Sequence, residues 1–294
     1  MEVFDDIPAL RGYVSGQKRD GRQVVLVPTM GGLHRGHGAC VEAGRQLDNA
    51  TLIVSIFVNP TQFAPGEDID RYPRTLAADL DLCREWGADA VFTPVVEDVY
   101  PSNQRTWVTV DELTEPLCGR TRPGHFVGVT TVVAKLFNIV QPDAAVFGQK
   151  DAQQALVIRE MTVQLDIPVR LHLAAIARED DGLARSSRNA YLDADERRRA
   201  SSINGALVEA AKSIQAGERD PAAVAAVAIR HMNEGGVDEV EYAELRGADD
   251  LCALDTIEGK VILAVAARVG GTRLIDNVVL DVAGDGSVAQ AMLY

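Results

Sequence analysis

The chain has 294 residues, of which 47% are hydrophobic and 24% charged, a composition typical of a globular protein with a sizeable core. Its length predicts one large domain or two unequal ones. The net charge of −14 argues against nucleic acid and anionic membranes as partners, because an acidic surface repels both. No charged-then-apolar leader opens the sequence, and no apolar run approaches the roughly 18 residues of a membrane span. We therefore expect a soluble, cytoplasmic protein.

The four cysteines support a reducing compartment. Cys40, Cys83, Cys118 and Cys252 lie far apart, without a C-x-x-C pair and without histidines at metal-ligand spacing. We interpret them as reduced thiols rather than as disulfides or zinc ligands, and we expect no protein-bound metal.

The most informative stretch is residues 24–37, VVLVPTMGGLHRGH. Its four leading apolar residues predict a strand buried on both faces, which Pro28 should end because proline has no N–H to donate. Gly31 and Gly32 predict a tight turn, and a helix is expected to begin near Gly36. A glycine turn before a helix N-terminus is typical of a phosphate site.

His34 and His37 are one helical turn apart, so both rings can point the same way at this expected site. Two hydrogen-bond donors beside a phosphate pocket indicate phosphoryl or nucleotidyl chemistry. The alternative is that one or both rings merely cap or pack at the helix start.

Strand-like and helix-like segments alternate over the next 110 residues or so, which predicts a Rossmann-like, doubly wound parallel sheet. A polar loop with Asn59 and Gln62 follows the second strand, at the edge of the sheet where ligands bind in such folds. We expect helices over residues 39–48, 76–86 and 130–139, strands over 51–58, 90–92 and 144–147, and an irregular stretch over 94–128.

A second polar group follows the strand at 144–147. It comprises Gly148, Gln149, Lys150, Asp151 and Gln154, at the start of a helix expected over residues 151–165. Lysine could reach a phosphate as a mobile charge, and the Asp151 and Gln154 side chains would share one face. The alternative is that Asp151 only caps the helix.

A third polar group, Ser186, Ser187 and Arg188, lies in a loop after a strand expected over residues 171–177. Two hydroxyls and a fixed cation suit a triphosphate whose charge grows in a transition state, although such loops are often simply solvated.

The remaining chain predicts a smaller α+β domain. We expect helices over 193–215 and 221–234, the second with Pro221 in its first turn, and strands over 240–245, 260–269 and 274–280. The predicted domains are residues 1–176, carrying the nucleotide site, and residues 177–294, closing over that site.

Together, PTMGGLHRGH, SIFVNPTQF, RPGHFVGVTTVVAKLFNIVQPDAAVFGQKDAQQ, DGLARSSRN and ARVGGTRLIDN resemble the pantoate–β-alanine ligase family, in the family's order and over nearly the whole chain. The H-x-G-H motif alone would indicate only the wider nucleotidyltransferase superfamily. The resemblance implies that ATP and pantoate form pantoyl adenylate and pyrophosphate, and that β-alanine then displaces AMP. It also implies Mg²⁺ arriving with ATP, and a homodimer.

The resemblance further implies roles for individual residues. His37 would be the catalytic donor, assisted by His34, Lys150, Ser186, Ser187 and Arg188. Pantoate would bind Gln62 and Gln154, and β-alanine would bind Asn59 and Gln62. Arg122 would hold part of a flexible wall, and Asp79 would be at most an indirect Mg²⁺ contact. ATP would contact Met30, Gly31, Gly32, Leu33, His34, Arg35, Gly36, His37, Gly148, Gln149, Lys150, Asp151, Ala177, Arg185, Ser186, Ser187 and Arg188.

Four residues depart from the family pattern: Arg35, Gly38, Ala152 and Arg185. Each adjoins the expected site without removing a polar group that the reaction needs. Two alternatives stay open, namely another nucleotidyltransferase of the same superfamily and a non-catalytic nucleotide-binding relative.

Overall fold

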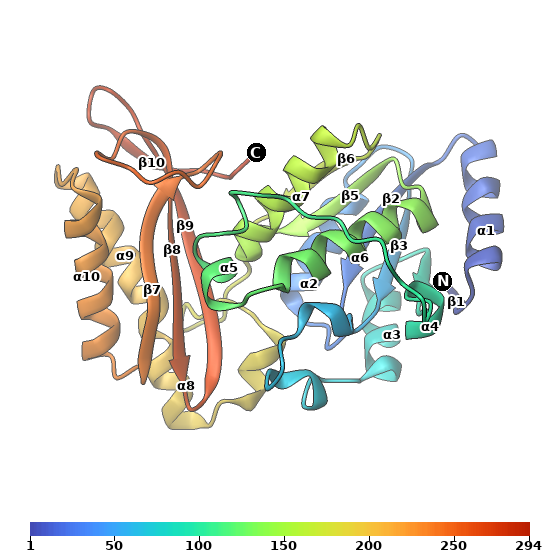
Figure 1. The fold of residues 1–294 in the computed structure, drawn as a ribbon, viewed down its shortest axis with the longest axis horizontal. Helices are drawn as coiled ribbons and strands as arrows, with labels where there is room; N and C mark the ends of the chain where they lie inside the picture. The colour runs from blue at the N-terminus through green and yellow to red at the C-terminus, as the bar shows by residue number, and fades with distance from the viewer. The chain divides into compact units, whose positions relative to one another are not determined.

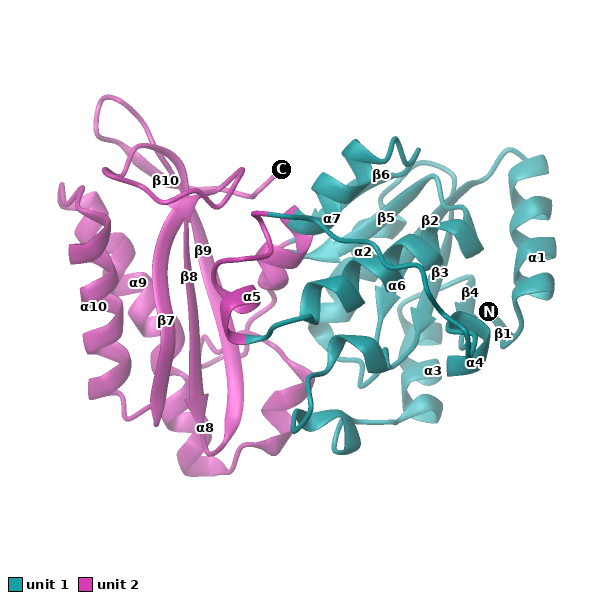
Figure 2. Cartoon of the chain, viewed as in Figure 1, with its two compact units in different colours: residues 1–111, 122–148, 157–174 teal, residues 112–121, 149–156, 175–294 magenta.

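The computed structural model describes residues 1–294 and contains two units, each discontinuous in sequence (Figure 2). Unit 1 comprises residues 1–111, 122–148 and 157–174. Unit 2 comprises residues 112–121, 149–156 and 175–294. The functional division of the chain at residues 176 and 177 stays a prediction.

Unit 1 is built on a six-stranded parallel sheet in the order β1-β4-β3-β2-β5-β6 (Figure 1). This order confirms the predicted doubly wound fold. The strands are β1 Glu2–Phe4, β2 Gln23–Thr29, β3 Ala50–Ile56, β4 Ala90–Phe92, β5 Ala144–Gly148 and β6 Arg170–Ala174.

Helices cover the sheet of unit 1, with α2 contacting β2, β3, β5 and β6, and α1 and α6 contacting each other and β2. Val25 and Val27 pack with Cys40 and Val41 of α2 in one buried cluster. The α-helices are α1 Ile7–Arg19, α2 Arg35–Arg45, α3 Leu76–Glu85, α4 Val96–Val99, α6 His125–Val140 and α7 Ala152–Gln164, which begins in unit 2; the 3-10 helices are η1 Pro60–Gln62 and η2 Asp68–Asp70.

The prediction that Pro28 ends the first long strand was wrong. β2 continues to Thr29, pairing Pro28 with Ser55 and Thr29 with Ile56 of β3. The carbonyl of Thr29 accepts the N–H of Phe57, so Thr29 faces the β3 side and the missing N–H of Pro28 faces the β5 side. On that side the β2–β5 ladder covers only Val25 and Leu26, so no ladder bond is lost.

Four other segments differ from the sequence-based expectation. α6 begins at His125 rather than near 130, directly after Gly124 in the left-handed region. β6 ends at Ala174 rather than 177. The segment 193–215 forms two helices, because Ser201 ends α8 and precedes α9. No element is predicted over residues 1–22, where the structure has β1 and α1, whose first turn is capped by Asp6.

Unit 2 contains an antiparallel sheet in the order β10-β9-β8-β7, which confirms the predicted α+β character of this part. Its strands are β7 Glu239–Gly247, β8 Gly259–Val269, β9 Thr272–Val282 and β10 Val288–Gln290. Its helices are α5 Cys118–Thr121, α8 Ala194–Ala200, α9 Ser202–Gln215, α10 Pro221–Glu234, and the 3-10 helices η3 Gln149–Asp151 and η4 Ser187–Tyr191.

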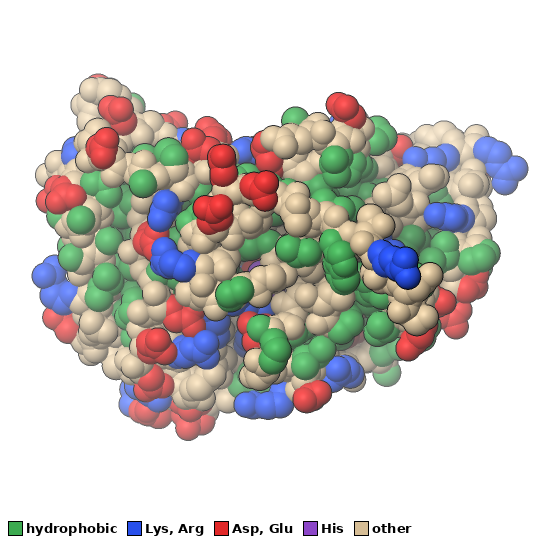
Figure 3. All heavy atoms as spheres, viewed as in Figure 1, with side chains coloured by type: hydrophobic (Ala, Val, Ile, Leu, Met, Phe, Trp, Pro, Cys, Tyr) green, Lys and Arg blue, Asp and Glu red, His purple; other side chains and the backbone are tan.

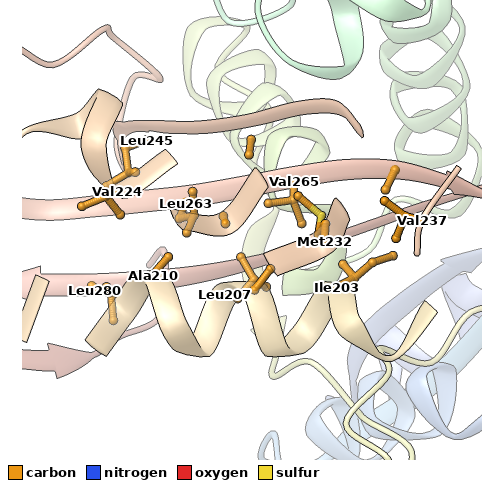
Figure 4. Close-up of a cluster of buried hydrophobic side chains, with 14 of the residues drawn as sticks. Ile203, Leu207, Ala210, Val224, Met232, Val237, Leu245, Leu263, Val265 and Leu280 are labelled. Atoms are coloured by element: carbon orange, nitrogen blue, oxygen red, sulfur yellow. The ribbon is translucent and has the colours of Figure 1, made fainter. Parts of the chain in front are cut away.

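The core of unit 2 lies between its sheet and the helices α9 and α10. Figure 4 shows side chains of both helices, such as Leu207 and Met232, meeting Leu263 and Val265 of β8. Pro221 begins α10 as predicted, with the Asp220 side chain capping its first turn.

Charged side chains of both signs lie on the surface, and most of the cysteines are buried. On the face drawn in Figure 3, acidic and basic side chains are interspersed. The four cysteines form no disulfides, and three of them are buried. No helix combines the length and apolar character that a bilayer crossing requires.

Candidate active site

In unit 1, the glycine turn after β2 is held by a buried carboxylate. Gly31 and Gly32 both have positive φ, and a Cβ on Gly31 would lie 3.0 Å from Asp79 Oδ2. Asp79 is 2% exposed and accepts the N–H groups of Gly32 and Leu33 at 3.0 and 2.8 Å. The N–H of Gly31 donates to Thr29 Oγ1 at 3.2 Å.

These contacts correct our interpretation of the turn as a backbone cradle for phosphate. Three of its N–H groups already donate to side chains of the protein, and a carboxylate beside them disfavours a second anion. Asp79 also accepts Thr75 Oγ1 at 3.2 Å, so its oxygens are committed to shaping the turn. An anion at this turn would therefore meet the side chains that the turn presents rather than its backbone N–H groups.

Those side chains include His34 and His37, whose ring centroids are 4.1 Å apart. His34 Nδ1 accepts the N–H of Gly36 at 3.1 Å, and His37 Nδ1 accepts the N–H of His34 at 3.2 Å. The pair forms a capping box at the start of α2, so both rings do cap the helix.

Capping also determines which ring nitrogen carries the proton. A neutral imidazole has one accepting and one donating nitrogen, so acceptance at Nδ1 places the hydrogen of each ring on Nε2. Two donors therefore come from one helix N-terminus, where the helix dipole favours a negative ligand. This arrangement is compatible with both capping and anion binding.

Two of the departures from the family pattern lie on α2. Gly38 is buried, and a Cβ there would lie 3.1 Å from the Trp86 ring, so Trp86 fills the space that a larger residue would take. Arg35 is exposed, 3.6 Å from Glu42, and leaves the capping contacts intact.

The Asn59–Gln62 segment follows β3 in unit 1. Asn59 Nδ2 donates to Gln62 Oε1 at 3.0 Å and to the carbonyl of Gly128 at 3.1 Å, while its Oδ1 accepts Thr61 Oγ1 at 2.9 Å. Because Gln62 Oε1 accepts from Asn59, its Nε2 points at Met30 Sδ, 3.0 Å away. Thioether sulfur is a weak acceptor, so a substrate oxygen could replace it.

Arg122, three residues before α6 begins, supports this segment. Its guanidinium donates twice to Glu67, at 2.6 Å each, and once to the carbonyl of Gln62 at 3.2 Å. His125 Nδ1 donates to the same carbonyl at 2.9 Å. Burial raises the pKa of Glu67, but the hydrogen bond and charge of Arg122 outweigh it, so the pKa is lowered.

In unit 2, Lys150 lies in η3, directly after β5 ends at Gly148. Its Nζ is 3.8 Å from Asp151 Oδ1, within ion-pair range but too far for a hydrogen bond. The Gln149 side chain is buried and accepts the N–H of Leu293 at 3.3 Å.

The two glutamines at the start of α7 differ in how deeply they are buried. Gln153 is buried and bonded to the backbone of Leu113, Pro116 and Cys118. Gln154, predicted to bind pantoate, is only partly buried. Ala152, which departs from the family pattern, is 5% exposed.

The serine-arginine loop of unit 2 leads into η4. Ser186 caps η4, accepting the N–H of Arg188 at Oγ, 3.3 Å away. The N–H of Arg185 donates to the carbonyl of Ala177 at 2.9 Å, and its guanidinium lies 3.1 Å from Glu179. The departure at Arg185 is therefore accommodated by an ion pair within the loop.

Within each unit, the structure brings some predicted residues together. Met30 meets Gln62 in unit 1, and β9 contacts both η3 and η4 in unit 2. Arg178, Asp276 and Asn277 were not predicted as site residues. From β9, Asn277 holds η3, and Asp276 holds the loop before η4 through Arg178. Asp276 and Asn277 end the quoted motif ARVGGTRLIDN, to which no role was assigned, and Arg178 stands three residues before the motif DGLARSSRN. No group of three or more His, Cys, Asp or Glu side chains could hold a metal ion.

Comparisons with known proteins agree with the predicted family. The family model for pantoate–beta-alanine ligase matches residues 2–279. The pantothenate synthetase of Moorella thermoacetica is 51% identical over 96% of this chain and 99% of its own length, and that of Acetivibrio thermocellus is 48% identical over 96% and 100%.

Solved structures give the same result. Pantothenate synthetase from Thermus thermophilus shares 40% identity with a TM-score of 0.89, covering 94% of this chain and 98% of that one. A pantoate–beta-alanine ligase from Francisella tularensis, solved with beta-gamma ATP and beta-alanine, shares 29% identity with a TM-score of 0.77 over 94% and 97%. The chain described here therefore belongs to the pantoate–beta-alanine ligase family.

Proposed function

We propose that this chain catalyses the ATP-dependent condensation of (R)-pantoate with β-alanine to pantothenate. First, a carboxylate oxygen of pantoate attacks the α-phosphorus of ATP, and pyrophosphate leaves. The β-alanine amine then attacks the acyl carbon of pantoyl adenylate and loses a proton, and AMP leaves. The observation that carries this proposal is the family match over residues 2–279.

Charge develops on the phosphates in the first step, so the site must supply donors and cations. We assign His37, assisted by His34, to donate from Nε2 to phosphate oxygen. Support comes from the two Nδ1 contacts, which keep both Nε2 atoms protonated. Lys150, Ser186, Ser187 and Arg188 would neutralise the triphosphate and the departing pyrophosphate. ATP would lie along residues 30–37 and 148–151 and beside Ala177 and Arg185.

The acceptor pocket is assigned to amide side chains. Gln62 and Gln154 would bind the hydroxyls and carboxylate of pantoate, and Asn59 with Gln62 would receive β-alanine. The contacts of Asn59 support this role, because they orient the Gln62 amide so that its NH₂ group is the presented donor.

Mg²⁺ would enter bound to ATP and offset the negative charge of the phosphates. Magnesium is commonly held by substrate phosphates with only one or two carboxylates. Asp79 is unsuited to hold it, since both of its oxygens accept backbone N–H groups. We therefore assign no protein ligand.

We also propose a homodimer acting in the cytoplasm, with residues 177–294 closing over a site on residues 1–176. Reduced cysteines are in keeping with the compartment. Sedimentation of the purified chain tests the dimer.

The function is tested by measuring AMP from ATP and Mg²⁺, with pantoate and β-alanine supplied together and each omitted in turn. We expect AMP only with both, together with pantothenate by mass spectrometry. Pantoate alone should give a stoichiometric burst of pyrophosphate. ATP binding without AMP under any condition would contradict the proposal and favour a non-catalytic relative.

A further inference from the structure

One pair of adjacent residues in β9 contacts two polar segments of unit 2, namely η3 with Lys150 and the loop that leads into η4. Asp276 and Asn277 are each 3% exposed, and β9 lies against both η3 and η4. We propose that these two are positioning residues, with Asn277 placing Lys150 and Asp276 placing the serine-arginine loop through Arg178. This inference rests on the function proposed above, because it needs Lys150 and that loop to act on ATP.

Asn277 holds the backbone from which Lys150 extends. Its Nδ2 donates to the carbonyls of Gln149 and Lys150, each at 3.0 Å, so both amide hydrogens are used on one turn of η3. A lysine side chain is long and flexible, so the region that its ammonium explores depends on where its Cα is fixed. These two hydrogen bonds hold the backbone of Lys150 in place.

Asp276 holds the loop through Arg178. The guanidinium donates from Nη1 to Oδ2 at 2.6 Å and from Nη2 to Oδ1 at 3.1 Å, a bidentate pair that also fixes orientation. Arg178 Nη1 further donates to the carbonyl of Gly182 at 3.1 Å, and Arg178 forms a β-bridge with Ala184. The hairpin that leads into Ser186 is thereby attached to β9.

The two attachments are linked at one carboxylate. Asp276 Oδ1 also accepts the N–H of its neighbour Asn277 at 2.8 Å. Around these residues β9 pairs only with β8, because β10 reaches no further than Leu280. On the side of β9 away from β8, no further strand therefore pairs with Asp276 or Asn277.

Stability alone does not account for this ion pair. A buried charged pair costs desolvation and often contributes no more than an apolar pair of similar volume. Burial of Asp276 raises its pKa, and the hydrogen bonds and charge of Arg178 oppose that shift. A bidentate pair does fix the geometry of a loop, which apolar packing would do less specifically.

A double-mutant cycle tests whether Asn277 positions Lys150. Asn277→Asp preserves size but removes the two donors. We expect single-turnover pyrophosphate release from ATP, Mg²⁺ and pantoate to slow by at least about tenfold in the natural chain. In a protein that already carries Lys150→Ala, Asn277→Asp should slow pyrophosphate release by less than about twofold, because the ammonium that Asn277 would position is absent.

The role of Asp276 in placing the serine-arginine loop is tested in the same way, with Asp276→Asn made alone and in an Arg188→Ala background. Asp281→Asn is the matched control, since Asp281 is exposed on the same strand, and its rate should equal that of the natural chain. The ATP dissociation constant is also measured by titration in every variant. It allows the same comparison of single and double variants without any reaction taking place.

Equal slowing in both backgrounds, with equal weakening of ATP binding, would overturn the inference, because it would indicate a general structural role. If the natural chain binds ATP but releases no pyrophosphate, the proposed function fails instead. The cycle in ATP affinity then still decides whether Asn277 acts through Lys150.

Discussion

At the scale of single residues, the two histidines show how one side chain can meet a structural and a chemical need. Each Nδ1 caps the start of α2, and this leaves each Nε2 as the nitrogen that carries hydrogen. Capping and catalysis were alternatives in the sequence, but the contacts make them compatible. The capping role is confirmed, and the catalytic role stays a prediction.

We expect His37→Ala to slow adenylate formation by at least about tenfold, equivalent to more than about 1.4 kcal/mol, through loss of the Nε2 donor. The lost cap should lower the free energy of unfolding by about 1 kcal/mol and leave the fold intact. Single-turnover pyrophosphate release and urea unfolding measure the two effects.

Asp6→Ala provides the matched control for that variant. Asp6 caps α1 through a 2.8 Å bond to the N–H of Ala9, and none of the proposed roles involves it. It should lose similar stability while retaining the natural rate. Near-normal adenylation by His37→Ala would remove His37 from the mechanism.

Asp79 is the residue whose role the structure changed most. Asp79→Asn keeps the shape but turns an NH₂ group toward one of the two N–H donors of the glycine turn. We expect the free energy of unfolding to fall by about 1–3 kcal/mol, the cost of leaving a buried donor unsatisfied. Adenylation should slow as well, because the turn leads directly into His34. Unchanged stability in urea unfolding would contradict this account.

At the scale of elements, a close approach between α6 and η1 fixes the Asn59–Gln62 segment. A Cβ on Gly128 would lie 2.5 Å from the carbonyl oxygen of Thr61 and 2.7 Å from the Cα of Gln62. Only glycine permits this approach. The carbonyl of Gly128 in turn receives Asn59 Nδ2.

Gly128→Ala should therefore push the segment away from α6. We expect a loss of about 1–3 kcal/mol in unfolding free energy from overpacking, and a raised KM for pantoate. Gly12→Ala is the control, since nothing lies within 4 Å of a Cβ there in α1. It should gain up to about 1 kcal/mol, with an unchanged KM. Equal effects of the two substitutions would argue against the close-approach explanation.

The ion pair between Glu67 and Arg122 predicts a dependence of stability on pH. The pKa of Glu67 is lowered from its ordinary value of 4.5, so the pair stabilises the fold fully above that value. This contribution is lost as the pH falls through the lowered pKa. Glu67→Gln should cost about 1–3 kcal/mol at pH 7, as expected for a hydrogen-bonded charge.

The difference between Glu67→Gln and the natural chain should shrink as the pH falls below 4.5, as measured by urea unfolding at several pH values. Asp81→Asn is a control, because its pair with Arg84 is largely exposed and worth little. A difference that stays constant with pH would show that the charge of Glu67 is not what matters.

At the scale of the whole molecule, unit 2 depends on two segments from the middle of the chain. Residues 112–121 and 149–156 belong to it, although residues 122–148 and 157–174 of unit 1 separate them from each other and from its main part. From the first segment, Cys118 Sγ lies 3.1 Å from the Tyr242 hydroxyl, and Thr121 Oγ1 accepts Arg273 at 3.2 Å. Burial raises the pKa of Tyr242 well above its ordinary value.

A fragment of residues 177–294 would lack both segments and leave Tyr242, Arg273 and Asn277 without these partners. We expect it to unfold at a lower urea concentration, with a broader transition than unit 2 shows in the full chain. Tryptophan is absent from the fragment, so circular dichroism is the suitable probe. Cooperative unfolding at the full-chain midpoint would instead support residue 177 as the start of an independent domain.

Sequence alone determined the features that depend on neighbouring residues. Apolar runs gave β2, β3 and β8, and Pro221 gave the start of α10, because strand burial and first-turn preferences are local. The motifs predicted the family and the candidate residues from Met30 to Arg188. Where the signal was weak, as in the short β1 and the amphipathic α1, no element was predicted.

The tertiary structure decided which groups the polar side chains meet. Asp79 reaches the glycine turn from 47 residues away, and Asn277 reaches Lys150 from 127. It also let β2 continue through Pro28, since only the strand order shows on which side the missing N–H falls. Hydrogen-bond partners distant in sequence depend on how the chain folds back on itself, and local residue patterns carry no record of that path.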